Sequence, residues 1–182
     1  MCYNRTTTPS VWQLGYSLLL SCALLLSGCQ EDMLPSDEDR RDGSQSQVGN
    51  MVEDFSFTLS TGEQTALTTR LQTHDAVVLY FTMWCPVCTE HMQHIQQHFI
   101  SAYPNVDFLF VDYLTDSVTN TRSTQLSQGW DGFDTISDFD NTLENLFDGT
   151  MAITVVIDKN SVVLLNEEFK NGARLEEALE NL

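Results

Sequence analysis

The chain has 182 residues, of which 26 are Asp or Glu and 8 are Lys or Arg, so its formal net charge at pH 7 is −18. Proteins that bind nucleic acids present a basic surface to the phosphate backbone, so we expect no nucleic-acid partner. The same charge argues against an electrostatic attachment to anionic lipids, and a membrane attachment would therefore need apolar chains.

The N-terminus has the pattern of a bacterial lipoprotein signal peptide. Arg5 precedes a leucine-rich apolar core at 14–26, which is too short to cross a bilayer comfortably. The core ends at 26–29 in Leu-Ser-Gly-Cys, which resembles a lipobox, whereas a plain secretory signal needs no cysteine there. We predict a signal peptide at 1–28 and a lipid on Cys29. The protein is then expected in the bacterial cell envelope, lipid-anchored and facing the periplasm or the cell exterior.

The rest of the chain divides into a tether and one domain. Residues 29–50 are polar and charged with almost no apolar side chains, so they predict a disordered acidic tether. Residues 51–182 are the length of a single globular domain.

The hydrophobic pattern of the domain predicts alternating strands and helices. Short runs at 55–59 and 64–67 on either side of a turn indicate a β-hairpin. The unbroken apolar run at 76–81 indicates a strand covered on both faces, and 106–113 is predicted as a second buried strand. The other predicted elements are a helix from 88 to about 102, a helix around 143–147, an antiparallel hairpin of 153–157 and 162–165, and an amphipathic helix at 172–182 whose apolar face includes Leu182.

The most informative motif is a Cys-Pro-Val-Cys sequence at 85–88, which follows the apolar run at 76–81. Two cysteines with this spacing at the start of a helix can form a disulfide within one helical turn. Unsatisfied amides and the helix dipole favour a thiolate at that end, which makes Cys85 the candidate nucleophile. Pro86 suits the first helical turn, because an N–H group there has no intrahelical partner.

The other three cysteines leave this pair available for chemistry. Cleavage of the signal peptide removes Cys2 and Cys22, and the lipid occupies Cys29. With no further cysteines to build a disulfide framework, Cys85 and Cys88 are interpreted as a redox-active dithiol.

Three segments together resemble the thioredoxin superfamily, and within it the membrane-anchored TlpA/ResA-like redoxin branch. They are 54–59 with the Gly-Glu that follows at 62–63, the block 77–88, and 154–158. The resemblance implies an α/β, thioredoxin-like fold with a central mixed sheet, flanking helices and an N-terminal β-hairpin extension. It also implies a thiol–disulfide oxidoreductase in which Cys85 attacks and Cys88 resolves the mixed disulfide.

The same resemblance implies the cofactor and the partners. No cofactor is expected beyond the redox-active disulfide of Cys85 and Cys88. The implied partners are thiols and disulfides of exported proteins and a membrane redox partner. The direction of exchange stays open, because the two residues between the cysteines do not fix the redox potential.

Two positions depart from the family pattern. The family usually has a cis-proline before the strand at 153–157, where this sequence has Ala152, so we expect a trans peptide and a differently shaped loop. Relatives often bury an acid six residues before the first cysteine, where this sequence has Leu79. The candidate substrate-contact residues are Trp84, Pro86, Ala152 and Ile153.

Two alternative functions use the same cysteines. One is a copper- or zinc-binding metallochaperone, because His91, His94 and His98 follow the dithiol at helical spacing. A solvated helix face is the interpretation of these histidines that we favour. The other is a thiol peroxidase, whose Pro-x-x-x-Thr-x-x-Cys pattern is matched at Thr82 but has Val78 in place of the proline.

Overall fold

The computed structural model describes residues 45–182. The predicted signal peptide, Cys29 and most of the predicted tether lie outside the described residues. Among residues 45–182, no helix is both long and apolar enough to cross a membrane. The elements are β1 (Ser56–Thr58), β2 (Gln64–Ala66), α2 (Leu67–Leu71), β3 (Ala76–Thr82), α3 (Pro86–Ile95), η2 (Gln96–Ile100), β4 (Val106–Asp112), α4 (Val118–Ser127), β5 (Thr135–Ser137), α5 (Thr142–Phe147), β6 (Ile153–Asp158), β7 (Val163–Glu168) and α6 (Ala173–Glu180).

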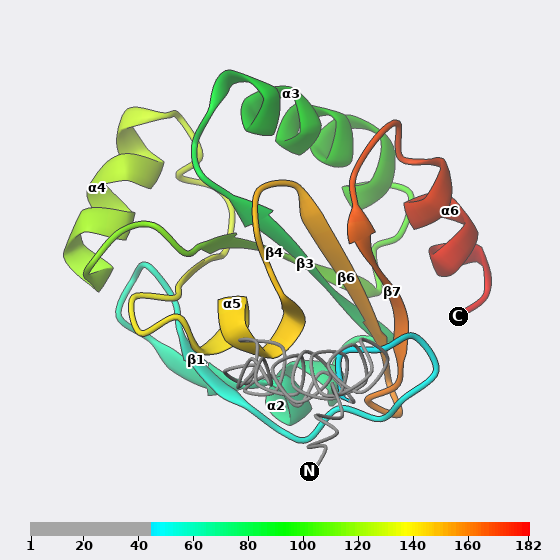
Figure 1. Ribbon diagram of the computed structural model, residues 1–182. Helices are drawn as coiled ribbons and strands as arrows, with labels where there is room; N and C mark the ends of the chain where they lie inside the picture. The colour runs from blue at the N-terminus through cyan, green and yellow to red at the C-terminus, as the bar shows by residue number, and fades with distance from the viewer. Residues whose placement is uncertain (1–44) are drawn as a thin grey trace, which may run out of the picture. The chain divides into compact units, whose positions relative to one another are not determined.

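A mixed five-stranded sheet forms the centre of the domain, in the order β5-β4-β3-β6-β7 (Figure 1). β3, β4 and β5 are parallel, whereas β6 runs antiparallel to β3 and β7 antiparallel to β6. Every residue of β3 and β4 is buried, because helices or the hairpin cover both faces there. The register pairs Ala76 with Val106 and with Asp158, so these three residues share one edge of the sheet. Thr82 and the dithiol lie at the opposite edge.

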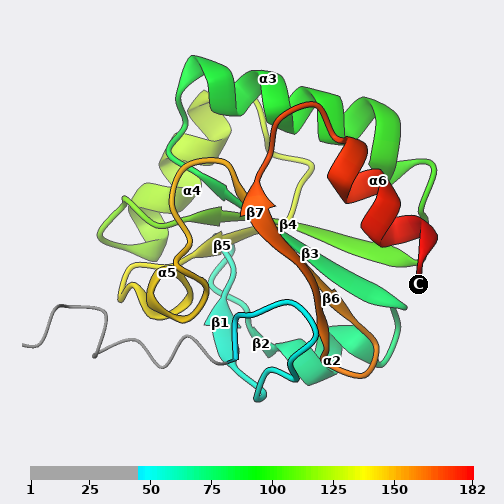
Figure 2. The ribbon, with the colours of Figure 1, turned by 45° about the vertical axis from the view of Figure 1, so that its right-hand side comes forward.

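The two faces of the sheet have separate cores, supplied by alternate residues of β3. Tyr80 packs with Met92 and Leu175 on the face covered by α3 and α6. Phe81 packs with Leu143 on the other face, under α2, α5 and the β1–β2 hairpin (Figure 2). The predicted hairpin and the predicted mixed sheet with flanking helices are thus confirmed.

The sequence analysis missed α2, α4 and β5. α4 has no apolar face, since its buried residues are Thr121 and Gln125. Their polar side chains are bonded inside the protein: the Thr121 hydroxyl lies 2.8 Å from that of Ser137, and Gln125 accepts a bond of 2.6 Å from Ser60. α2 is a single turn of five residues and β5 has three, too few to show a periodic pattern.

One predicted helix changes its winding along its length, and another ends earlier than expected. α3 ends at Ile95 and is continued to Ile100 by one π-helical turn, η2. α6 ends at Glu180, so Leu182, predicted on its apolar face, is 48% exposed. The prediction for Leu182 was therefore wrong, because the helix ends two residues before it although the apolar spacing continues.

Part of the predicted tether bonds to the domain. The Gly49 amide donates to the Val163 carbonyl at 2.8 Å, and the Asn166 side chain donates to the Ser46 carbonyl at 3.1 Å. Contacts with β7 therefore begin before residue 51, the predicted start of the domain.

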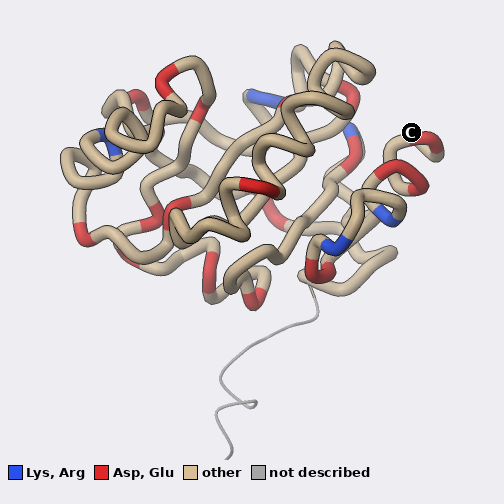
Figure 3. The backbone as a smooth tube through the Cα atoms, turned by 90° about the horizontal axis from the view of Figure 1, so that it is seen from above, with Lys and Arg blue, Asp and Glu red and all other residues tan. Residues whose placement is uncertain are grey.

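Acidic residues occur on most segments of the domain, whereas Lys and Arg occur on few (Figure 3). One basic residue has a structural role: Arg70 of α2 lies 2.6 Å from both Asp107 and Asp134. These ion pairs join α2 to the start of β4 and to the segment that leads into β5.

Candidate active site

A tight turn after β3 sets the dithiol at the start of α3. Trp84 adopts a left-handed backbone conformation with φ 59°, and its amide donates to the Thr82 hydroxyl at 3.1 Å. Cys85 is then the N-cap of α3, and Pro86 occupies the first turn. The Cys88 amide, one of the N–H groups without an intrahelical partner, donates to the Cys85 sulfur at 3.1 Å.

The two sulfurs differ in their access to other molecules. Cys85 is partly exposed at the helix start, whereas Cys88 is 0% exposed. A disulfide on another protein can therefore reach Cys85 but not Cys88.

The two thiols influence each other's ionisation. Burial and its hydrogen bond with Cys88 raise the pKa of the Cys85 thiol. Burial also opposes ionisation of Cys88, but hydrogen bonds from Cys85 and from the Met83 and Cys85 backbone outweigh it and lower the Cys88 pKa. The two thiols lose protons as a pair. Attack by Cys85 uses its thiolate, and the proton it loses can pass to Cys88 across their hydrogen bond.

The loop before β6 meets the dithiol through Met151, which the sequence analysis did not single out. The Met151 Sδ lies 3.7 Å from the Cys85 Sγ. The next residue, Ala152, adopts a left-handed conformation with φ 68°, and its amide donates to the Phe81 carbonyl at 3.0 Å. No peptide bond within residues 45–182 is cis. The altered loop thus turns Ala152 into the core and leaves Met151 beside the sulfur.

The four predicted substrate-contact residues differ in exposure. Pro86 is exposed next to the nucleophile, and Trp84 and Ile153 are half-buried. The Trp84 ring packs against the core, and its Nε1 is buried without a hydrogen-bond partner in the described part of the chain. Ala152 is 1% exposed and cannot present its side chain to a substrate, whereas Met151 is 40% exposed.

Tyr80 is a second site residue that the sequence analysis missed. Its side chain is 1% exposed, and its hydroxyl lies 3.0 Å from the Nδ1 atom of His91. Burial, followed by the charges of Cys88 and Cys85, raises the pKa of Tyr80 far above its ordinary value. Its position under α3 follows from the packing of α3 on β3 and gives no pattern in the sequence.

The three histidines do not converge on the sulfurs. His91 bonds to Tyr80, and the ring of His94 lies 4.4 Å from that of His98, centroid to centroid. Throughout 45–182, no three His, Cys, Asp or Glu side chains are grouped so that they could hold a metal ion.

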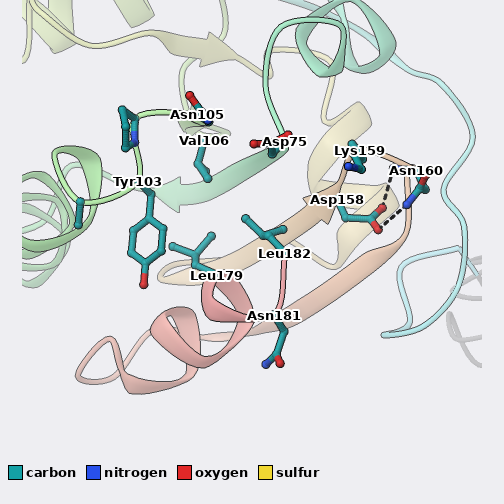
Figure 4. A pocket seen from close by; sticks show the side chains of 12 residues that line it. Asp75, Tyr103, Asn105, Val106, Asp158, Lys159, Asn160, Leu179, Asn181 and Leu182 are labelled. Carbon is teal, nitrogen blue, oxygen red and sulfur yellow. Dashed lines mark hydrogen bonds between the residues drawn. The ribbon is translucent and has the colours of Figure 1, made fainter.

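A cavity of about 420 Å³ lies at the other edge of the sheet (Figure 4). Its lining includes Asp75, just before β3, Asp158 at the end of β6, and Tyr103 and Leu179. Because the register sets Ala76 opposite Asp158 at this edge, the cavity is remote from the dithiol.

A comparison with known families decides which class of fold and chemistry this arrangement represents. Residues 48–165 match the AhpC/TSA family. The chain belongs to the AhpC/TSA family. Membership in this redoxin family indicates thiol–disulfide oxidoreductase activity, and the predicted resemblance to the redoxins is confirmed. A search of curated proteins found no match to this redoxin.

Solved structures share the thioredoxin-like fold of this redoxin. Peroxidoxin BcpB from Mycobacterium tuberculosis is 24% identical with a TM-score of 0.57, covering 74% of this chain and 94% of that chain. A thioredoxin-like protein from Aeropyrum pernix is 17% identical with a TM-score of 0.57, covering 93% and 99%. DsbF from MTB, solved in mixed oxidized and reduced forms, is 20% identical with a TM-score of 0.56, covering 76% and 96%. At these identities the likeness establishes the fold.

Proposed function

We propose that this redoxin is a membrane-anchored thiol–disulfide oxidoreductase that exchanges disulfides with exported proteins through Cys85 and Cys88. The observation that carries the proposal is the pairing of an accessible sulfur with a buried one. Cys85 caps α3 and accepts the Cys88 amide, while Cys88 is 0% exposed within the same turn. This is the arrangement that a two-step exchange requires.

The exchange moves two electrons and needs no further cofactor. The Cys85 thiolate attacks a disulfide of the client, forms a Cys85–client disulfide and releases the other client sulfur as a thiolate. Cys88, as a thiolate, then attacks the Cys85 sulfur. The Cys85–Cys88 bond forms, the second client sulfur leaves with its electron pair, and the client is reduced while the dithiol is oxidised. The reverse sequence oxidises a client.

Exposed apolar side chains around Cys85 support a protein client. Met83 is 39% exposed, Val87 48% and Met151 40%. Met83 and Val87 are close to the dithiol in sequence, and the Met151 sulfur contacts that of Cys85. Leu114, 56% exposed, follows β4 at the same edge of the sheet. A partly unfolded polypeptide could cover this apolar surface while its disulfide reaches Cys85.

A thiol peroxidase fits these contacts less well. The Thr82 hydroxyl accepts the Trp84 amide, and its hydrogen bond with Cys88 helps to lower the pKa of that thiol. The sulfur that Thr82 assists is thus the buried one, which a peroxide in solvent does not reach. Val78, in place of the expected proline, points to the same conclusion.

The function can be tested by alkylating the reduced protein at neutral pH and mapping the modified cysteine. Cys85 is expected to react well before Cys88, because Cys88 is 0% exposed. Titration of the same couple against glutathione should give one two-electron transition and the direction of exchange. Equal alkylation rates at both cysteines, or no reversible transition, would contradict the proposal.

The anchor is the second part of the proposal, and it places the protein in the cell envelope beside a membrane redox partner. It rests on the lipobox-like residues 26–29. Replacing Cys29 by alanine is expected to abolish incorporation of labelled fatty acid and to release or mis-process the protein. Acyl chains are the expected attachment, because the net charge of −18 disfavours electrostatic binding to lipid. Failure of the unchanged protein to incorporate label would refute this part alone.

A further inference from the structure

During the second step of the exchange, the buried Cys88 thiol must lose its proton, and it needs a path by which that proton can reach solvent. Before the first step, the Cys85 thiol donates to the Cys88 sulfur, and its proton passes to Cys88 when Cys85 attacks. Once Cys85 is joined to a client, that sulfur can no longer accept a proton. Cys88 is 0% exposed, so water cannot take the proton directly, and Leu79 stands where relatives often bury an acid. The inference below rests on the proposed function.

We propose that Tyr80 and His91 form a proton relay that carries the proton of the Cys88 thiol to solvent while Cys88 resolves the mixed disulfide. Cys88 and His91 are three residues apart on α3, so they lie on the same face of the helix. Tyr80 of β3 lies beneath that face, with its hydroxyl 3.0 Å from His91 Nδ1.

The Tyr80 hydroxyl is placed to exchange protons with both neighbours. Its oxygen lies 3.0 Å from His91 Nδ1, and its interaction with Cys88 is one of the causes that raise its pKa. The other ionisable groups that act on it are Cys85 and Tyr113. Its raised pKa, caused first by burial, means that tyrosine does not hold a negative charge here. It can therefore pass a proton on only by receiving one at the same time.

His91 connects this hydroxyl to solvent. The ring is half-buried, held edge-to-face by Tyr80 and packed on the ring of Phe169 at 4.8 Å. Burial lowers the His91 pKa and His94 adds to this, while the carboxylates of Glu90 and Glu168 oppose it. The net effect keeps His91 neutral at neutral pH. With its own proton on Nε2, it can accept the Tyr80 proton at Nδ1.

The resolving step then balances as follows. The Cys88 proton moves to the Tyr80 oxygen as the Tyr80 hydroxyl proton moves to His91 Nδ1. The Cys88 thiolate attacks the Cys85 sulfur, the Cys85–Cys88 bond forms, and the client leaves as a thiolate with the electron pair of the broken bond. His91, now an imidazolium, gives up its Nε2 proton to water, and the client thiolate takes a proton from water.

The test follows the two steps separately in the purified, reduced protein. An aromatic disulfide with a coloured leaving thiolate releases one thiolate when Cys85 attacks and a second when Cys88 resolves. In Tyr80→Phe, the second release is expected to be about tenfold to a hundredfold slower at neutral pH, with the first unchanged. His91→Gln, which cannot accept a proton, should show the same loss.

The pH profile separates a relay from a packing effect. The relay is complete while His91 is neutral and is lost as pH falls through the His91 pKa. The ratio of the wild-type to the Tyr80→Phe resolving rate should therefore fall toward one over that range, and the inflection should be absent from His91→Gln. Tyr103→Phe, which removes a hydroxyl at the far edge of the sheet, and His74→Gln are the matched controls and should leave both phases unchanged.

Several results would overturn the relay. One is a second thiolate release in Tyr80→Phe and His91→Gln that is as fast as in the wild type. Another is a slowing of that release in Tyr80→Phe that is the same at every pH. A third is an equal slowing in Tyr103→Phe. Absence of the first phase from the wild-type protein would refute the proposed function itself, and the relay with it.

Discussion

Replacing Cys88 by serine is expected to stop turnover and to leave the protein joined to its clients. The exposed Cys85 still attacks, because its place at the start of α3 does not depend on the Cys88 sulfur. The mixed disulfide then persists, since resolution by a thiol held within the same helical turn is replaced by attack from thiols in solution. Loss of that intramolecular advantage should slow resolution by about two orders of magnitude or more.

The measurement is the yield of high-molecular-weight adducts on non-reducing gels of cells that express the variant, with identification of the trapped proteins. Cys85→Ser is the matched control, because it changes the same atom on the neighbouring cysteine and removes the attacking sulfur. It should trap nothing and show no turnover. If the Cys85→Ser variant formed as many adducts as Cys88→Ser, Cys85 would not be the attacking cysteine, and the prediction would be contradicted. The trapped clients would also show whether the protein acts on exported polypeptides.

The elements predicted from sequence are those whose pattern reflects how they are buried. β3 and β4 are buried along their whole length, and their apolar residues stand in continuous stretches at 76–81 and 108–111. α6 has an apolar face and a polar face, and its 3.6-residue period is visible up to its end. α4 gave no such signal, because it buries Gln125, whose amide bonds to the Trp130 and Phe133 carbonyls. Burial of polar groups that bond to the backbone leaves no hydrophobic period to read.

The candidate site divides in a similar way. The positions of Cys85, Pro86 and Cys88 follow from local rules, since a dithiol at a helix start is specified within a few residues of chain. Tyr80 and Met151 reach the same site through tertiary packing. Nothing local indicates that Tyr80 would lie under His91, because that contact depends on how α3 packs on β3. The departure at Ala152 was visible, but its consequence, a buried alanine and a methionine at the sulfur, was not.

Gly149→Ala is expected to destabilise the fold, because the glycine lies against a ring in the core. A Cβ atom built there would be 2.2 Å from Cε1 of Phe81, which is 0% exposed. Gly149 is not among the residues with positive φ, so alanine suits its backbone and the overlap alone opposes the change. Overpacking of this kind costs about 1–3 kcal/mol in the free energy of unfolding. The measurement is urea denaturation of the wild-type and variant proteins.

Two further variants make the cause explicit. Gly132→Ala is the matched control, because a Cβ at that glycine meets nothing within 4 Å, and its unfolding free energy should change by less than about 0.5 kcal/mol. Combining Gly149→Ala with Phe81→Leu makes room for the new methyl group, so the double variant should lose less stability than the two single changes added together. Additive losses would show that the ring is not what opposes a side chain at Gly149. Met151 follows Gly149 by two residues, so a shift of this loop should also weaken the contact of Met151 with Cys85. The packing of Phe81 in the core would then affect the chemistry of the dithiol.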